Sequence, residues 1–587
     1  MLDPAAALRY ASRTMRLERF LDDLGRQALR DALGADAPPV VRPTSDPKHG
    51  DFQLNGVLPL AKQQKKPPRD LATPVAAALA RHEAVLSAEV AGPGFVNLTL
   101  RPAWLAARLD EDLRDTARDG VPAVAQAQRI MVDYSSPNIA KQMHVGHLRS
   151  TILGASIVAL ARYVGHDVLG DNHLGDWGTQ FGMLIAGMRH FGDEAALADD
   201  AISELERIYK LATERAKQDE AFADEARAEL AKLQAGDPTN RALWERFVAA
   251  TRVALGRVYA RLGVTFDEWL GESAYDAMLP GVVDDLLARG LAREDGGAIC
   301  VFFEDVPELA KIETPFIVRK KDGAFLYATT DLATILHRRD HFHAARSIYV
   351  VDMRQSLHFK QLFALARKLD VTMRLDHVGF GTVLGEDGKP LKAREGRAVT
   401  LASLLDEAES RAAARIREEG LDVPEEELAA VARAVGIGAV KYADLRQNRL
   451  SDYQFDWDKM ISFKGNAGPY LQYAYARIGS LFRKGGIDPS TASGPLVLAA
   501  PEELALARQL ARFGDVVHDA AETCEPHRVC DHLFAIARLF SGFYEACPVL
   551  RADDAATRAS RIALCWLTQR QLARGLSLLG LATIERM

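Results

Sequence analysis

This sequence has little cysteine, no long apolar run and no excess of positive charge. Its 587 residues include 5 cysteines, none of them in a Cys-x-x-Cys pair, which is typical of a reducing compartment. No stretch approaches the roughly 18 uninterrupted apolar residues that a membrane span needs. The first residues lack a basic start before an apolar core, so no secretory signal is expected. These absences favour a cytoplasmic protein without a membrane anchor.

The net charge of −7 at pH 7 excludes a protein that coats nucleic acid through bulk charge, but it leaves a local RNA surface open. Cys524, His527 and Cys530 are the nearest approach to a metal-binding cluster. Their spacing is too open for a paired-cysteine zinc motif and no fourth ligand is evident. We therefore predict no metal site and interpret these cysteines as core residues.

The chain is too long for one hydrophobic core, so several domains are expected. The first part begins with a helix-spaced apolar pattern and closes with a turn and an alternating strand near residue 100. The central part alternates between strands and helices around one charged, helical stretch. The last part is mostly helical, without internal repeats. We predict an N-terminal domain, a central domain with a helical insertion, and a C-terminal helical domain, at residues 1–115, 125–425 (insertion about 193–262) and 426–587.

Four short runs in the central part are predicted to be strands. Because helical stretches separate them, the pattern favours a parallel sheet with helices on both faces. Ligands of such sheets bind beyond the carboxyl ends of the strands. The predicted strands are Arg129–Tyr134, Asp167–Gly170, Ser347–Val351 and His377–Val383.

The most informative segment, residues 135–147, follows the first of these strands. It places His144 and His147 around Gly146, directly before a stretch with helical periodicity. Unpaired backbone N–H groups and the helix dipole attract phosphate at such a position. Gly146 lets a ligand approach the backbone closely, and the two imidazoles can donate to phosphate oxygens. The segment therefore predicts an ATP site.

This His-x-Gly-His string resembles the signature of class I aminoacyl-tRNA synthetases, and its flanking residues resemble the arginyl-tRNA synthetases specifically. The resemblance implies an α/β Rossmann-like class I core with an N-terminal α+β additional domain and a C-terminal all-α anticodon-binding bundle. Six further segments carry the same resemblance: 50–53, 91–97, 174–182, 327–332, 452–458 and 465–474.

What the resemblance implies is an arginine–tRNA ligase with ATP and Mg²⁺ as cosubstrate and no tightly bound cofactor. The arginine carboxylate attacks the α-phosphorus, and arginyl-adenylate then passes its arginine to the terminal ribose 2′-OH of tRNA(Arg). A synthetase for another amino acid and a catalytically silent RNA-binding paralogue are the alternatives, and a monomer is expected. The implied catalytic residues are His144, His147, Lys141, Lys389 and Lys392. The implied ATP-binding residues are His144, Gly146, His147, Gly175, Asp176, Gln180, Gly379 and Gly381.

Selection of arginine requires carboxylates and oxygen acceptors, because a guanidinium is a planar fork of donors. Asp331 and Tyr327 are four residues apart, so a helix would place them on one face, where both can meet the guanidinium. A helix N-cap is the alternative for Asp331. The resemblance implies the arginine-binding set Asp133, Ser136, Asn138, Tyr327, Asp331 and Gln355.

Class I synthetases usually carry a mobile Lys-Met-Ser-Lys-Ser loop, and residues 385–394 stand in its place without the Met-Ser core. Lys389 and Lys392 are candidate cations there, with a solvated hairpin as the alternative and Lys141 as a substitute. Unstacked tRNA bases bind aromatic and polar side chains. The candidates for tRNA binding are Tyr473, Asn466 and Gln472, although core packing is at least as common for such tyrosines.

Overall fold

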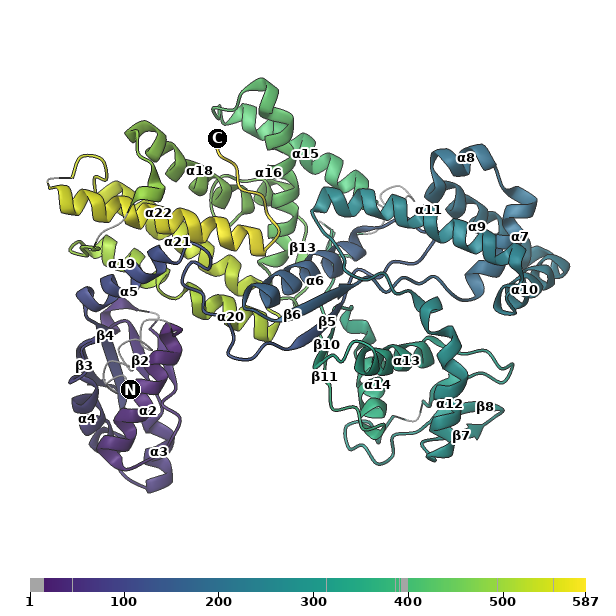
Figure 1. Cartoon of the computed structure of the whole chain (residues 1–587), viewed down its shortest axis with the longest axis horizontal. Coiled ribbons are helices and arrows are strands. Elements are labelled where there is room, and N and C mark those ends of the chain that lie inside the picture. Colours follow the sequence, from purple (N-terminus) through teal and green to yellow (C-terminus); the bar gives the residue numbers. More distant parts are fainter. Residues whose placement is uncertain are drawn as a thin grey trace. The chain divides into compact units, whose positions relative to one another are not determined.

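The computed structural model describes residues 15–44, 46–312, 314–385, 387–389, 391, 400–492, 495–552 and 554–587. The chain forms two compact units, which are described separately (Figure 1). The first comprises Met1–Val124, Glu418–Val431 and Ser462–Met587, and the second comprises Ala125–Arg417 and Ala432–Ile461. In the part of the chain that the structure describes, no helix combines the length and apolarity needed to cross a bilayer.

An antiparallel four-stranded sheet of order β1-β2-β4-β3 forms the N-terminal part of the first unit. Its strands β3 and β4 form a hairpin, and β4 is the predicted strand after the turn, with alternating buried and half-exposed residues. The strands are β1 (Val41–Pro43), β2 (Phe52–Leu54), β3 (Val85–Ala91) and β4 (Phe95–Leu100). The helices are α2 (Leu17–Leu33), η1 (Pro47–His49), α3 (Val57–Gln64), α4 (Pro68–Leu79) and α5 (Pro102–Arg114).

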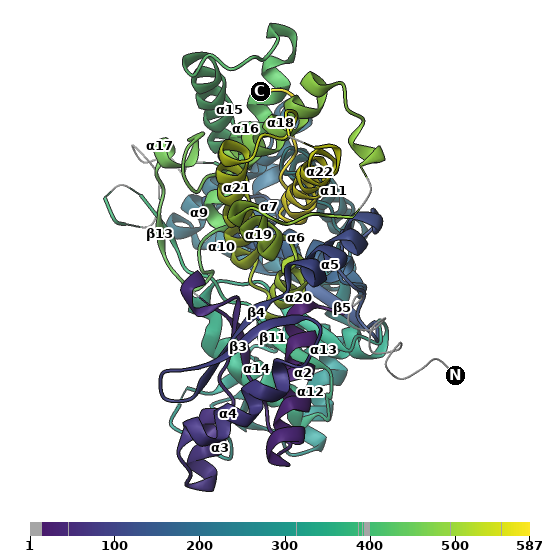
Figure 2. The ribbon, with the colours of Figure 1, turned by 90° about the vertical axis from the view of Figure 1, so that its left-hand side faces the viewer.

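The remainder of the first unit is helical, as predicted for the end of the chain. Figure 2 shows α18, α21 and α22 packed together, and their buried faces are lined by leucine, isoleucine and phenylalanine. Gly486 closes α18 in the left-handed conformation that glycine favours. The elements are α18 (Gly468–Gly485), η4 (Pro489–Thr491), α19 (Pro501–Leu510), α20 (Phe513–Thr523), α21 (His527–Ala546) and α22 (Ala555–Leu578).

The second unit is built on a parallel sheet of order β11-β10-β5-β6. Its apolar strands are buried on both faces, as parallel strands usually are. The chain leaves β5 towards β6 on one side, and β11 follows β10 on the other, so the strand order reverses between β5 and β10. Ligands bind at such switch points. The strands are β5 (Arg129–Asp133), β6 (Asp167–Asp171), β10 (Arg346–Tyr349) and β11 (Arg374–His377).

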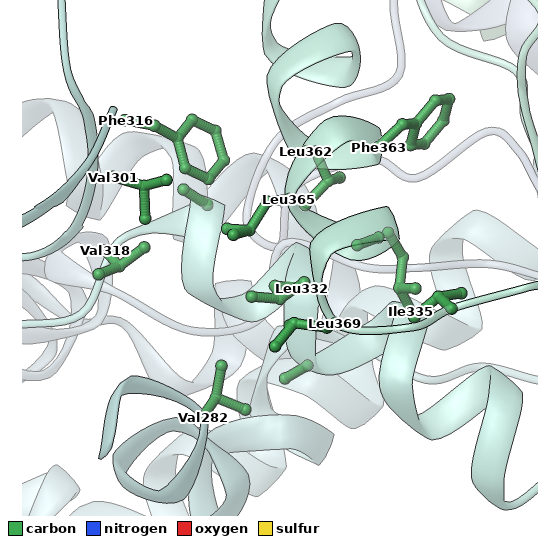
Figure 3. Close-up of a cluster of buried hydrophobic side chains, with 14 of the residues drawn as sticks. Val282, Val301, Phe316, Val318, Leu332, Ile335, Leu362, Phe363, Leu365 and Leu369 are labelled. Atoms are coloured by element: carbon green, nitrogen blue, oxygen red, sulfur yellow. The ribbon is translucent and has the colours of Figure 1, made fainter. Parts of the chain in front are cut away.

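Helices α12 to α14 enclose a large apolar core beside this sheet (Figure 3). Leu332 and Ile335 of α13 meet Leu362 and Leu365 of α14 there, so the two helices are held at fixed positions by packing. The neighbouring elements are η2 (Glu272–Met278), α12 (Leu279–Ala288), β7 (Ala292–Asp295), β8 (Ala298–Val301), β9 (Phe316–Arg319), α13 (Tyr327–Asp340), η3 (Met353–Gln355) and α14 (Ser356–Lys368).

The predicted helical stretch over 193–262 consists of four helices, and Gly236 and Asp237 separate the third helix from the fourth. Gly236 has a φ of +84°, and the Asp237 carboxylate accepts hydrogen bonds from the first backbone N–H groups of α11. The helices on either side of the sheet and in this stretch are α6 (Val145–Tyr163), α7 (Thr179–Phe191), α8 (Glu194–Asp199), α9 (Ala201–Gln218), α10 (Glu220–Gln234) and α11 (Pro238–Leu262).

Two strand predictions need correction. The run His377–Val383 is not one strand: β11 ends at His377, and Val383 opens the separate strand β12 (Val383–Leu384), which pairs with β13 (Tyr453–Gln454). The antiparallel sheet β7-β8-β9 was not predicted; its strands are short, and β7 has three exposed charged residues in succession and therefore no alternating pattern. The remaining helices are α15 (Leu401–Glu418), α16 (Glu425–Leu445), whose residues are shared between the two units, and α17 (Trp457–Met460).

Candidate active site

The turn after β5 is conformationally strained. Ser135, Ser136 and Ala140 have φ values of +70°, +46° and +61°, in the left-handed region that non-glycine residues rarely adopt. Buried hydrogen bonds hold the turn, among them Ser135 N–H to the Ser150 hydroxyl at 2.9 Å. Strain of this kind persists only where surrounding structure enforces it, and it clusters at functional sites. The turn lies at the switch point of the sheet.

The two histidines of the motif cap the N-terminus of α6 and contact each other. Nδ1 of His144 accepts the Gly146 N–H at 3.0 Å, and Nδ1 of His147 accepts the His144 N–H at 3.1 Å. Their ring centroids are 4.0 Å apart. Because both Nδ1 atoms are acceptors, the proton of each neutral imidazole is on Nε2. Both rings therefore present an Nε2–H donor at a helix N-terminus.

Both imidazoles are neutral near pH 7. Burial, and then the charge of Lys141, lowers the pKa of His144. Burial, with smaller effects of His144 and Lys141, lowers the pKa of His147 to about 4. Lys141 is exposed, and its ammonium lies 6.0 Å from the ring centroid of Tyr209. The positive charge at this site thus comes from Lys141 and the helix dipole, while the histidines act as donors.

The next predicted ATP residues form a compact cluster with Asn138. Gly175 accepts the amide of Gln180 at 2.9 Å and the N–H of Ile139 at 3.2 Å. A Cβ on Gly175 would lie 2.0 Å from Oδ1 of Asn138, so only glycine fits there. Asp176 is buried, and both its oxygens accept hydrogen bonds from Ser273 at 2.8 Å. The structure therefore gives the Asp176 carboxylate an internal partner.

Gly379 and Gly381 lie in the segment between β11 and β12. A Cβ on Gly379 would meet the sulfur of Met353 at 2.0 Å, and one on Gly381 would meet Asp452 at 2.6 Å. Lys389 is exposed in a tight turn, in which Gly385 N–H donates to the Lys389 carbonyl at 2.8 Å. Lys392, the other predicted cation of this loop, lies outside the described residues.

A buried arginine holds the carboxylate at the end of β5. Nη2 of Arg338 donates to Asp133 at 2.8 Å and to Asp171 at 2.7 Å, and Arg338 is completely buried. The second oxygen of Asp133 accepts the Ser136 hydroxyl at 2.9 Å. Asp133, Asp171 and His173 present ligand atoms within 4.8 Å of one another, but the Arg338 guanidinium already donates a hydrogen bond to each of the two carboxylates. This group therefore does not suit a metal cation.

Asp331 lies within α13, four residues after Tyr327 at its start, so the helical placement was predicted correctly and an N-cap role is excluded. The Asp331 carboxylate accepts Nε2–H of His358 at 2.6 Å, and its side chain is 25% exposed. Tyr327 is 61% exposed, and its ring lies 5.0 Å from that of His358. Gln355 is exposed at the end of η3, directly before α14. The side chains of Tyr327, Asp331 and His358 thus form one partly exposed group, called the acidic wall below, whose carboxylate is that of Asp331.

A second carboxylate belongs to this region. Burial, opposed by His173 and assisted by the charges of Asp331 and Asp176, raises the pKa of Glu272 to about 7. Sequence reasoning missed Glu272, His358 and Arg338. Glu272 is a lone acidic residue at the start of a short 3-10 helix and carries no local signal, and the partners of the other two are distant in sequence.

The residues proposed for tRNA contact are in the first unit, at the start of α18. Tyr473 and Asn466 are half-exposed. Gln472 is completely buried and donates its amide to the Ala582 carbonyl at 2.9 Å. This placement leaves Gln472 no surface for a base.

A parallel sheet with a switch point, followed by a helix that His-x-Gly-His caps, defines the catalytic core of a class I aminoacyl-tRNA synthetase. Three family models match the chain: "Arginyl tRNA synthetase N terminal domain" over 20–100, "tRNA synthetases class I (R), catalytic domain" over 111–457, and "DALR anticodon binding domain" over 471–587. The chain belongs to the arginyl-tRNA synthetases.

Individual relatives support the same membership. The arginine–tRNA ligase of Laribacter hongkongensis (strain HLHK9) is 48% identical over 98% of this chain and 100% of its own length. That of Edwardsiella ictaluri (strain 93-146) is 45% identical with the same coverage. The solved arginyl-tRNA synthetase of Thermus thermophilus superposes with a TM-score of 0.81 at 28% identity, covering 97% of this chain and 100% of that one.

Proposed function

We propose that this chain is an arginine–tRNA ligase that uses ATP, and that the residues described above carry the reaction. The observation that supports this most strongly is the presence of two elements in one unit of the structure. The His144–His147 cap offers phosphate donors, and the acidic wall around Asp331 suits a guanidinium. A catalytically silent RNA-binding protein has no need of both elements.

Activation of arginine needs no side-chain nucleophile in this scheme. One oxygen of the arginine carboxylate attacks the α-phosphorus of Mg²⁺–ATP, the bond to the bridging oxygen breaks, and pyrophosphate leaves. The Nε2–H groups of His144 and His147 and the ammonium of Lys141 stabilise charge on the phosphate oxygens. Lys389, which is exposed in its turn, is proposed as a second cation for the leaving pyrophosphate.

The arginine side chain is proposed to lie between Asp331 and Glu272, with the hydroxyl of Tyr327 as a further acceptor. Two carboxylates match the donor fork of a guanidinium and neutralise its charge. The raised pKa of Glu272 fits this role, because a bound cation removes the repulsion that Asp331 exerts on it. The amide groups of Asn138 and Gln355 are proposed for the α-amino end of the substrate.

The remaining assignments are also proposals. Three domains at about 1–115, 125–425 and 426–587 would bind the tRNA body, catalyse the reaction and read the anticodon, and Tyr473 and Asn466 would contact unstacked bases. After activation, the terminal 2′-OH of tRNA attacks the carbonyl carbon of arginyl-adenylate and releases AMP. We propose a cytoplasmic monomer with magnesium bound through the ATP phosphates.

Charging of tRNA tests the function directly. The purified chain, incubated with ATP, tRNA and each amino acid in turn, is expected to form an aminoacyl ester with arginine alone. Charging with another amino acid at a similar rate would contradict the pocket, and tRNA binding without any charging would favour the silent paralogue.

Replacement of Gly146 by alanine is expected to reduce the rate of arginine activation by about 10- to 100-fold. The added Cβ would lie 2.7 and 2.9 Å from two atoms of the His144 ring, which must then move out of the cap. Steady-state kinetics in ATP measure the effect. Gly256→Ala is the matched control, since no heavy atom lies within 4 Å of a Cβ there. Equal activity of the two variants would show that the His144 position is not critical.

The apparent KM for arginine is expected to rise as the pH falls below about 7. Glu272 has a pKa of about 7 in the free protein, so it is protonated and neutral below that pH. A guanidinium prefers the ionised carboxylate, and its binding must then displace a proton, which costs up to about tenfold in affinity per pH unit. Arginine titrations between pH 6 and 8 measure this slope.

Glu272→Gln is the control for that dependence. The variant is expected to show a higher KM for arginine that no longer varies over this pH range. An unchanged slope in the variant would assign the titration to another group.

A further inference from the structure

We infer that His358 is a positioning residue for arginine recognition, which holds the carboxylate of Asp331 and the ring of Tyr327 in the orientation that the guanidinium requires. The inference rests on the proposed role of Asp331 and deepens it. None of the sequence motifs that indicated the pocket included this histidine.

The geometry places His358 between the two recognition residues. Its Nε2 is 2.6 Å from Oδ2 of Asp331, and its ring centroid is 5.0 Å from that of Tyr327. The side chain is 12% exposed. One imidazole thus contacts both residues proposed to select the substrate.

The rest of the ring is fixed by aromatic packing. The ring of Phe316 stacks against it at 5.6 Å and 28°, and that of Phe359 meets it edge-on at 5.4 Å. Phe316 itself is part of the apolar core beneath α13 and α14 (Figure 3). The imidazole therefore connects a rigid core to an exposed pocket wall, and it has little freedom to turn away from Asp331.

The hydrogen bond between His358 and Asp331 has a defined donor and acceptor, and it restricts the orientation of the carboxylate. An ionised carboxylate only accepts, so Nε2 of His358 carries the proton that is donated to Oδ2. This bond fixes the rotamer of Asp331 and leaves Oδ1 as the oxygen for the substrate guanidinium. Without it, Asp331 must be ordered when arginine binds, and part of the affinity is lost.

His358 is expected to affect the binding of arginine and to leave the binding of ATP unchanged. The expected result for His358→Ala is therefore a KM for arginine raised by about 10- to 100-fold, as for loss of a charge-assisted hydrogen bond, with the KM for ATP unchanged within about twofold. His358→Gln places an amide N–H close to the position of Nε2, so it is expected to restore most of the arginine affinity.

The test is aminoacylation with saturating tRNA, varying arginine and ATP separately for His358→Ala, His358→Gln, Asp331→Asn and the double variant His358→Ala/Asp331→Asn. His341→Ala is the matched control, because His341 is an exposed histidine directly after α13, the helix that carries Asp331, and contacts His337 and Phe342. Coupling between His358 and Asp331 predicts that the double variant loses little more than Asp331→Asn alone.

The outcomes separate this inference from the proposed function. Equal increases in both KM values, additive effects in the double variant, or failure of His358→Gln to exceed His358→Ala would each overturn the positioning role. An unchanged KM for arginine in Asp331→Asn would instead overturn the proposed guanidinium site. If the activity of Asp331→Asn is too low for a KM to be determined, the comparison of His358→Ala with His358→Gln tests the positioning role.

Discussion

Asp331→Asn is expected to reduce kcat/KM for arginine by about 10²- to 10⁴-fold while the protein remains folded. The substitution removes the charge that faces the substrate cation and leaves the guanidinium desolvated against a neutral amide. Truncation of one partner of a hydrogen-bonded charge pair of this kind costs about 2–5 kcal/mol. The side chain is 25% exposed in the free protein, so folding itself loses little.

Steady-state aminoacylation measures this loss, with arginine and ATP varied in turn. Asp340→Asn is the control, because Asp340 is an exposed carboxylate on the same helix and pairs with the adjacent Arg339. The control is expected to behave as the parent protein. Retained arginine turnover in Asp331→Asn would contradict the pocket assignment.

Arg338→Met is expected to lower the free energy of unfolding of the second unit by about 3–5 kcal/mol, since it leaves two buried carboxylates without a countercharge. Arg338 is completely buried and joins Asp133 at the end of β5 to Asp171 at the end of β6. Burial already raises the pKa of Asp171 despite the guanidinium. Loss of the arginine also releases Asp133, which holds the Ser136 hydroxyl in the active-site turn.

The neighbouring residue gives a sharp control for this prediction. Arg339 is exposed and pairs with Asp340, and exposed pairs of that kind contribute about 0–1 kcal/mol. Thermal unfolding is therefore expected to show a large loss of stability in Arg338→Met and a small one in Arg339→Met. A similar small shift in both variants would show that the buried bridge contributes little to stability.

The local part of the site could be predicted from the sequence. The strand β5, the polar turn and the histidine-capped helix α6 follow one another within 35 residues, so alternation, turn chemistry and helix periodicity were enough. The placement of Tyr327 and Asp331 on one helix was predictable for the same reason. These features depend on neighbours in sequence.

The residues that orient the site could not be predicted in this way. His358 meets Asp331 across 27 residues, and Arg338 meets Asp133 across 205 residues. The first pair exists because α13 and α14 pack together, and the second because α13 lies against the end of β5, and such packing leaves no periodic signal in the segments involved. The missed sheet β7-β8-β9 has the same cause, since its four-residue strands are defined by their pairing.

The most direct test of the account is ATP–pyrophosphate exchange, measured with and without tRNA. The account predicts exchange that depends on arginine and is lost in Asp331→Asn. If exchange required tRNA, the bound RNA would be needed to complete the active site. Exchange without tRNA would be equally consistent with the assignment. No arginine-dependent exchange under either condition, from a folded chain that still binds tRNA, would contradict it.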